Sequence, residues 1–493
     1  MRKSKIRFTT LLFVLLIPLF FINIADYHYW GGDFSQYIFQ AQNVCNGINQ
    51  GEQFYVYNPN YSELAPQAYP PGFPLLLAPA VCYFNTDYSS LFTYMSIFFI
   101  LNSIVWFILI AKFEKPWISF VVVLLASYLP WMLDFKLNIL SDIPFSLFFA
   151  LSIILFLKLL KSKHKFILSL LLACCVGFTI LIKTMGFALS IAFIVYVFYA
   201  YFVKKRYQLK DLAFITFSAV LSVVIYKIGT ALLLKNVEGH VEHFASFFFE
   251  EEILERFLNN LFYYYTTYRH FLSLEGSLFN FPNALFIDFL IICTLLGFIL
   301  TFKNYKTIKI TEFIFGIFVI VVALFPYYQG YRYILALTPI FFIYMIRGIS
   351  LIQQNIKIKP FFIFIIILLS YLLPLRIYLV KSAKTISASS KYVENIETQE
   401  TFNYIKNNTT IEDTIIFIKP RVLALYTHRY SASNYPYYNN LEEIKEDVES
   451  LHANYIIQSK EIMNYATQLY IDSVLQKKDT TFYNNSFVIY RIN

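Results

Sequence analysis

The chain has 493 residues, of which 58% are hydrophobic and only 14% are charged, and its mean hydropathy is +0.55. Soluble domains average about 45 to 50% apolar and 25% charged residues, so this composition excludes a soluble globular protein. The net charge of +9 comes from lysines scattered singly between apolar runs, which argues against nucleic acid as a partner.

The N-terminus carries a basic patch, from Arg2 to Arg7, followed by an apolar stretch from Phe8 to Ile24. Signal peptides and membrane anchors share this pattern. Because no cleavage site with small residues follows the stretch, we interpret it as an uncleaved first membrane span.

Further apolar runs are long enough, or nearly so, to cross a hydrocarbon core of about 30 Å. With the first run, the expected spans are 8–25, 90–111, 116–132, 143–160, 166–182, 186–203, 211–234, 284–302, 310–327, 333–349 and 360–380. The sequence therefore predicts a mainly α-helical, polytopic transmembrane protein with about 11 spans.

The charges of the connecting segments predict the orientation. If the N-terminus is cytoplasmic, the inner segments together carry 20 Lys and Arg residues, whereas the short outer loops carry 3. Positive charge collects on the cytoplasmic side of membrane proteins, so the sequence favours this orientation. We therefore expect a protein surrounded by membrane lipids, with its N-terminus cytoplasmic and its C-terminus outside.

This orientation gives two domains and two long outer loops. The transmembrane domain is predicted over residues 1–381, with outer loops at 26–89 and 235–283. Residues 382–493 are more polar and alternate helix-like with strand-like patches, ending in alternating apolar residues around an Asn-Asn turn. We expect them to form a small extracytoplasmic α/β domain with a mixed sheet.

The first outer loop opens with GGDFSQYIFQAQN, in which Gly31 and Gly32 end the span and Asp33 begins an amphipathic helix. Tyr37 falls on its apolar face and Gln36 on its polar face, so the helix is expected to lie along the membrane surface. Asp33 can be read as a helix cap or first-turn carboxylate, or as a base for an acceptor hydroxyl.

Other polar residues of the outer loops stand next to apolar spans. Tyr69 begins the rigid turn YPPGF; Asp142, in SDIPF, suits either a helix start or an active centre. Lys183 and Arg332 either snorkel to the interface or bind an anion such as phosphate. In the second long loop Arg269 follows a run of tyrosines typical of an aromatic belt.

Cys45 and Cys82 both lie on the expected outer, oxidising side, so a disulfide between them is one alternative. The sequence does not determine their distance, and intervening helices could separate them. No CxxC pair or zinc-ligand spacing is present among the five cysteines.

Several of these segments resemble one family. GGDFSQYIFQAQN and YPPGFPLLLAP look like the first periplasmic loop of the GT-C glycosyltransferases, in the branch of bacterial protein O-mannosyltransferases and lipid A aminoarabinose transferases. LNILSDIPF (137–145), KTMG (183–186), GYRYILALTP (330–339) and KPRVLALYTHR (419–429) extend the resemblance in order along the chain.

The resemblance implies a place in the bacterial cytoplasmic (inner) membrane. It also implies transfer of a sugar from a polyprenyl-phosphate donor to an acceptor at the outer face of that membrane, with inversion. Asp33 matches the family's first-loop catalytic acid, although this chain lacks the second adjacent acid of many relatives, and Asp142 matches another carboxylate near the active centre. If the two carboxylates converge, a divalent metal could bridge them. The expected contacts to the lipid phosphate or donor are Lys183, Arg332 and Tyr69. Arg269 is added as a further donor contact on its position alone, because its loop matches no motif of the family. Those that position the acceptor or the loop are Gln36 and Tyr37.

Two other classes of function remain open. One is a flippase, transporter or polymerase of lipid-linked glycans; the other is a receptor or scaffold anchored by its spans. The sugar and the acceptor, whether protein, lipid A, glycan or another lipid, cannot be read from the sequence, because loop contacts that vary within a fold determine specificity.

Overall fold

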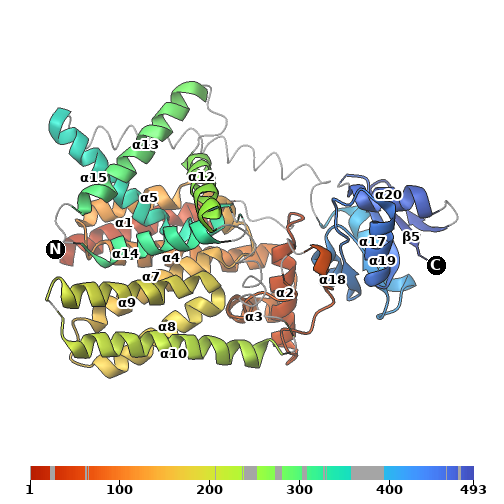
Figure 1. Ribbon diagram of the computed structural model, residues 1–493, viewed down its shortest axis with the longest axis horizontal. Coiled ribbons are helices and arrows are strands. Elements are labelled where there is room, and N and C mark those ends of the chain that lie inside the picture. The colour runs from red at the N-terminus through yellow and green to blue at the C-terminus, as the bar shows by residue number, and fades with distance from the viewer. Residues whose placement is uncertain are drawn as a thin grey trace.

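The computed structural model describes residues 2–22, 28–61, 64, 66–205, 207–235, 237, 253–272, 280–302, 308–325, 328, 330–356, 393–461, 464–475 and 479–492. Long apolar helices run alongside one another, and a small unit that contains a β-sheet lies beyond one end of them (Figure 1). The predicted mainly α-helical class with a small C-terminal sheet is confirmed.

The helices of the bundle are mostly apolar along their whole length. They are α1 (Arg2–Phe21), α4 (Tyr88–Ile110), α7 (Asp142–Leu159), α8 (Lys165–Ile182), α9 (Phe187–Phe202), α10 (Leu209–Leu233), α13 (Asn280–Thr301), α14 (Ile310–Leu324) and α15 (Thr338–Ile356). By length and composition, seven helices of the described residues can cross a membrane, or eight if one bent pair counts as a span. The expected number of 11 spans is not confirmed, and the expected span 360–380 lies outside the described residues.

The bent pair lies where a single span is expected at 116–132. The helices α5 (Pro116–Ser127) and α6 (Pro130–Lys136) meet at 65°. Pro130 has no N–H to donate to the preceding turn, so it ends one helix and begins the next. Lys136, at the end of α6, is fully buried and donates to the carbonyl oxygen of Ile22 at 2.9 Å.

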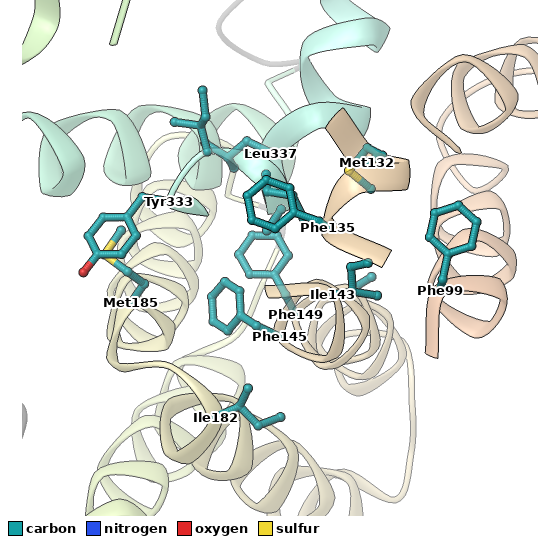
Figure 2. Packing of buried hydrophobic residues seen from close by; sticks show 14 of the residues in the cluster. Phe99, Met132, Phe135, Ile143, Phe145, Phe149, Ile182, Met185, Tyr333 and Leu337 are labelled. Carbon is teal, nitrogen blue, oxygen red and sulfur yellow. The ribbon is translucent and has the colours of Figure 1, made fainter. Parts of the chain in front are cut away.

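The bundle is held together by close packing of large apolar side chains. Ile143, Phe145 and Phe149 of α7 are buried in the same cluster as Met132 of α6 and Leu337 (Figure 2). At another contact the helix backbones approach each other directly, because a Cβ added to Gly348 of α15 would lie 1.9 Å from a carbonyl oxygen of α13. Small residues at such crossings are typical of membrane helices.

Two shorter helices, α2 (Gly32–Cys45) and α3 (Gly72–Phe84), pack against each other, and α2 runs across the ends of the long helices (Figure 1). A disulfide joins Cys45 to Cys82, the alternative that the sequence left open. The predicted polar face of α2 is not exposed, because Gln40 and Asn43 are buried and bond to the chain that follows the helix. The further helix α12 (Ile253–Leu272) packs against α14.

The C-terminal unit is a five-stranded mixed sheet with order β2-β1-β3-β5-β4, flanked by helices. Its elements are α17 (Ile396–Asn408), β1 (Thr414–Ile416), α18 (Pro420–Thr427), β2 (Tyr430–Ala432), α19 (Leu441–Ser450), β3 (Ala453–Ser459), α20 (Tyr465–Val474), β4 (Thr480–Tyr483) and β5 (Phe487–Arg491). β1 is parallel to β2 and β3, and the hairpin β4–β5 turns at Asn484, whose side chain accepts from two backbone N–H groups.

The segment between α2 and α3 is attached to this C-terminal unit. Tyr55 forms a parallel bridge with Ser431 of β2, and the Asn58 side chain donates to the Asp447 carboxylate at 3.0 Å and to a carbonyl oxygen of the unit at 3.0 Å. Helix α18 also packs directly on α2. These contacts bring residues 375 to 389 positions apart in the chain to the same end of the bundle.

Candidate functional site

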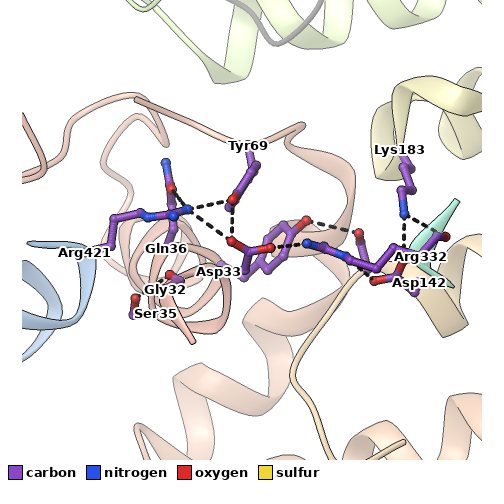
Figure 3. Close-up of polar contacts among 11 residues, drawn as sticks. Gly32, Asp33, Ser35, Gln36, Tyr69, Asp142, Lys183, Arg332 and Arg421 are labelled. Atoms are coloured by element: carbon purple, nitrogen blue, oxygen red, sulfur yellow. Dashed lines mark hydrogen bonds and ion pairs between the residues drawn. The ribbon is translucent and has the colours of Figure 1, made fainter. Parts of the chain in front are cut away.

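Four predicted site residues, Asp33, Asp142, Lys183 and Arg332, meet at the end of the bundle that faces the C-terminal unit (Figure 3). Arg421, from the first turn of α18, joins them. We call these five residues the charged cluster. Each charged side chain stands at the start of a helix or at a break between helices.

Asp142 is the buried anchor of the charged cluster. Its side chain is 1% exposed, and its two oxygens accept from Lys183 Nζ at 2.6 Å and from Arg332 Nε at 3.3 Å. Lys183 Nζ also donates to the carbonyl oxygen of Arg332 at 3.1 Å, which ties the loop before α15 to the break between α8 and α9. Asp142 lies in the first turn of α7 and is not its cap, which is Ser141.

Asp33 lies between the two arginines. One carboxylate oxygen pairs with Arg332 Nη1, and the other accepts from Tyr69 Oη at 2.6 Å and from Arg421 Nη1 at 3.2 Å. Arg332 therefore bridges Asp33 to Asp142. Asp33 is in the first turn of α2 and not its cap, which is Gly31. Its side chain keeps 21% exposure and that of Arg332 24%, so these two residues form the accessible side of the cluster.

The remaining polar residues hold this arrangement in place. Arg421 Nη1 donates to Tyr69 Oη at 2.6 Å and to Gln36 Oε1 at 3.2 Å. Gln36 in turn donates to the backbone just before Tyr69. Tyr37 stacks on the Tyr69 ring at 4.8 Å, and its hydroxyl bonds with Ser141 Oγ at 3.0 Å, next to Asp142.

The surrounding charges decide the protonation of the cluster. Burial alone would raise the pKa of Asp33, but Arg332, Arg421 and the hydrogen bond from Tyr69 outweigh it and hold this pKa well below its usual range. Burial lowers the pKa of Lys183 to about 8, against the opposing effect of Asp142, so the amine is mostly charged at neutral pH. Three cations against two carboxylates leave one surplus positive charge.

The cluster fits a divalent metal poorly. All four oxygens of Asp33 and Asp142 already accept from a side-chain cation or a hydroxyl, and the Arg332 guanidinium occupies the position between the two carboxylates. No group of three or more His, Cys, Asp or Glu side chains that could hold a metal occurs in the described part of the chain. The arrangement of donors favours an anion instead.

Arg269 does not join the charged cluster. It lies on α12 and pairs with Asp288 of α13 at 3.0 Å. Arg421, by contrast, is a member that the sequence-based list of site residues lacks. The sequence KPRVLALYTHR, which contains Arg421, resembles a family motif. Because Arg421 lies 388 residues after Asp33, the sequence could not predict that its guanidinium contacts the Asp33 carboxylate.

Compared by sequence, the chain matches no protein-family model and no curated protein. Its structure is similar to that of ArnT from Cupriavidus metallidurans bound to undecaprenyl phosphate, with a TM-score of 0.59 and 14% identity over 98% of this chain and 97% of that one. It is also similar to the oligosaccharyltransferase AglB from Archaeoglobus fulgidus in complex with an inhibitory peptide and a dolichol-phosphate (TM-score 0.58, 12% identity, 99% and 76% covered). The predicted GT-C fold and multi-pass membrane architecture are confirmed.

Proposed function

We propose that this chain, which has the GT-C fold, is a membrane glycosyltransferase that moves a sugar from a polyprenyl-phosphate donor to an acceptor hydroxyl. The observation that carries the proposal is the surplus positive charge of the charged cluster, formed by Lys183, Arg332 and Arg421 around two carboxylates. Charge-assisted hydrogen bonds from such groups, and bidentate ones from arginine, are what a phosphate needs.

The fold supports the choice of donor. The similar structures include one bound to undecaprenyl phosphate and one in complex with a dolichol-phosphate, both of which are polyprenyl phosphates. In the present chain Asp142 and Lys183 lie at the ends of apolar helices long enough to cross a membrane, so a phosphate bound there would be at the depth of a lipid head group. We assign the contacts to the donor phosphate to Lys183, Arg332 and Arg421, with Tyr69 as a neutral donor.

The proposed reaction is a single inverting displacement. The acceptor oxygen forms a bond to the anomeric carbon while the bond from that carbon to the phosphate oxygen breaks, and the electron pair leaves on the lipid phosphate. Asp33 takes the acceptor proton as general base. The cations stabilise the charge that develops on the departing phosphate.

Asp33 is a weak base while Arg332 and Arg421 are paired with it, since both hold its pKa low. A donor phosphate competes for the same guanidinium groups. When it draws Arg332 away, the main opposing charge on Asp33 is reduced and its pKa rises. In this proposal the donor itself thus activates the base, and Asp142 keeps Lys183 and Arg332 in place.

We further propose that the charged cluster faces outward from the bacterial cytoplasmic membrane, with residues 1–381 as the transmembrane domain and 382–493 as an extracytoplasmic domain. The excess of Lys and Arg in the segments at the other end of the bundle supports this orientation. The disulfide between α2 and α3 supports it too, because α2 also carries Asp33 and disulfides persist in oxidising compartments.

The test separates chemistry from binding through Asp33→Asn, with Asp288→Asn as the matched control. Asp288 is also a carboxylate paired with an arginine, but it lies outside the charged cluster. Cell-envelope glycoconjugates from cells without the protein, and from cells that express each variant, are compared by mass spectrometry for one missing sugar. Binding of undecaprenyl phosphate to the purified variants is measured in parallel.

We expect Asp33→Asn to lower transfer by about 10²- to 10⁴-fold, the usual contribution of a general base. The affinity for undecaprenyl phosphate should be unchanged or higher, because the variant removes a negative charge next to the phosphate. The Asp288→Asn variant should retain both the sugar transfer and the affinity for undecaprenyl phosphate. Undiminished transfer by Asp33→Asn would overturn the assignment of the base, and an envelope unchanged by loss of the protein would contradict the proposed function.

A further inference from the structure

The ends of α4 and α7 that lie near the N-terminus, at the opposite end of the bundle from the charged cluster (Figure 1), border a basic hollow. It has a volume of about 370 Å³ and is bounded by the turn after α4, the end of α7 and the start of α8. Its lining residues are Lys112, Phe113, Leu157, Lys158, Lys161, Ser162 and Leu168. Three of the seven are lysines and none is acidic.

The positive charges of the basic hollow act on one another. Burial and then the charges of Lys158, Lys5 and Lys161 lower the pKa of Lys112. Lys5 approaches from α1 and donates to the carbonyl oxygen of Ala111 at 2.6 Å. Four ammonium groups from three parts of the chain thus repel each other around one hollow, and this arrangement costs free energy unless an anion is present.

The acid closest in sequence does not neutralise them. Glu114 pairs with Arg347 at 2.6 Å and with Lys309 at 3.6 Å, on the side of α14 and α15. Throughout the described ranges, no ion pair involves Lys112, Lys158 or Lys161. The counter-ion of the hollow must therefore come from outside this part of the protein.

The shape of the site favours a lipid over a soluble ion. Phe113, Leu157 and Leu168 supply apolar lining between the lysines. Beside the hollow, one face of α8 exposes Ile167 and Leu171, each at least half accessible, in a helix apolar enough to span a membrane. A ligand with a phosphate in the hollow can therefore extend acyl chains along this helix into the bilayer.

We propose that the basic hollow is a binding site for the phosphate head group of an anionic phospholipid, in the leaflet opposite to the charged cluster. Basic pockets between membrane helices are known to hold such head groups, and each lysine near a membrane surface contributes to the attraction. The asymmetric distribution of lysines in membrane proteins requires only that these residues lie in loops. It does not require that they converge on one hollow, and Lys115 and Lys210 lie at the same end of the bundle without lining it.

The test compares Lys112→Gln/Lys158→Gln with Lys115→Gln/Lys210→Gln, in the full-length protein in detergent. Each variant loses two positive charges from the same end of the bundle, but only the first alters the hollow. Native mass spectrometry measures the Kd of dioleoylphosphatidylglycerol, with dioleoylphosphatidylcholine as the zwitterionic comparison. Thermal unfolding is recorded without lipid, with either lipid and with millimolar inorganic phosphate.

We expect phosphatidylglycerol to bind the first variant about thirtyfold more weakly than the unchanged protein, and the second variant with unchanged Kd. Without lipid the first variant should be as stable as the unchanged protein or more so, since repulsion is relieved. The proposed binding site would be contradicted by an equal loss of phosphatidylglycerol affinity in both variants, by no loss in either, or by equal binding of phosphatidylcholine. Equal stabilisation by inorganic phosphate would overturn the assignment to a lipid.

Discussion

His28 is buried at the junction between the bundle and the C-terminal unit. Its ring stacks on Phe34 of α2 with centroids 3.7 Å apart, and its backbone N–H donates to Glu394 at 2.9 Å. Burial lowers the pKa of His28 to about 4, although its bond with the carbonyl oxygen of Tyr29 opposes this effect. The folded protein therefore holds this imidazole neutral, whereas the unfolded chain protonates it near pH 6.5.

This difference in pKa predicts that His28 destabilises the folded protein as the pH falls. The unfolded state binds the proton first, so the free energy of unfolding should fall between about pH 6.5 and pH 4, by up to about 3 kcal/mol. His28→Phe keeps a ring against Phe34 and removes the proton site. Unfolding midpoints measured from pH 7 to pH 4.5 should fall less in this variant, and parallel curves would contradict the prediction. The raised pKa of the neighbouring Glu394 acts in the opposite direction in both proteins.

At the residue scale, the sequence predicted which polar residues lie at one end of the bundle but not how they pair. Alternating helices bring Asp33, Asp142, Lys183 and Arg332 to the same membrane surface, and topology predicts this directly. Which cation meets which carboxylate depends on side-chain distances of a few ångströms. Arg269 thus pairs with Asp288, only 19 residues away in the chain, while Arg421 reaches the charged cluster from the far end of the sequence.

The contact between α2 and α18 depends on a close approach at the start of α2. A Cβ added at Gly32 would lie 3.0 Å from the Arg421 guanidinium, whereas one at Gly31 would meet nothing within 4 Å. Gly32→Ala should therefore displace Arg421 and weaken undecaprenyl phosphate binding several-fold, with little change in unfolding temperature. Gly31→Ala is the matched control. Equal affinities in the two variants would show that Arg421 does not contact the phosphate.

The crossing of α13 and α15 depends on glycine more strictly. Added Cβ atoms would lie 2.0 Å from the carbonyl oxygen of Tyr344 at Gly297, and 1.9 Å from that of Cys293 at Gly348. Gly348→Ala forces the backbones apart, so we expect the free energy of unfolding to fall by roughly 1–3 kcal/mol or more. Gly316→Ala in α14, with open space around it, should be neutral. Thermal unfolding in detergent measures both, and equal effects would contradict direct backbone contact.

At the scale of the whole molecule, the site is completed by the C-terminal unit. Arg421→Gln should weaken undecaprenyl phosphate binding by about tenfold or more, because a charge-assisted bond to phosphate is lost. Arg491→Gln, on an exposed residue of β5 in the same unit, should leave binding unchanged. Isothermal titration of both variants provides the comparison. Equal affinity would indicate that the unit covers the site without taking part in it.

The fold was predictable in outline because apolar runs, loop charges and alternating strands are local signals. Pro130 breaks an expected span into α5 and α6, a bend that hydropathy averages do not detect. The buried polar face of α2 could not be foreseen either. This face contacts the loop that follows the helix and α18. A polar face made of Gln36, Gln40 and Asn43 has the same sequence pattern whether it contacts water or other parts of the protein.

The pairing of Asn58 with residues of the C-terminal unit also has a consequence in time. Asn58 donates to the carbonyl oxygen of Ser433, 375 residues later in the chain. At synthesis rates of about 5 to 20 residues per second, Ser433 is synthesised roughly 20 to 75 seconds after Asn58. A nascent chain already inserted in the bilayer therefore lacks Arg421, and the site cannot be assembled until translation is almost finished.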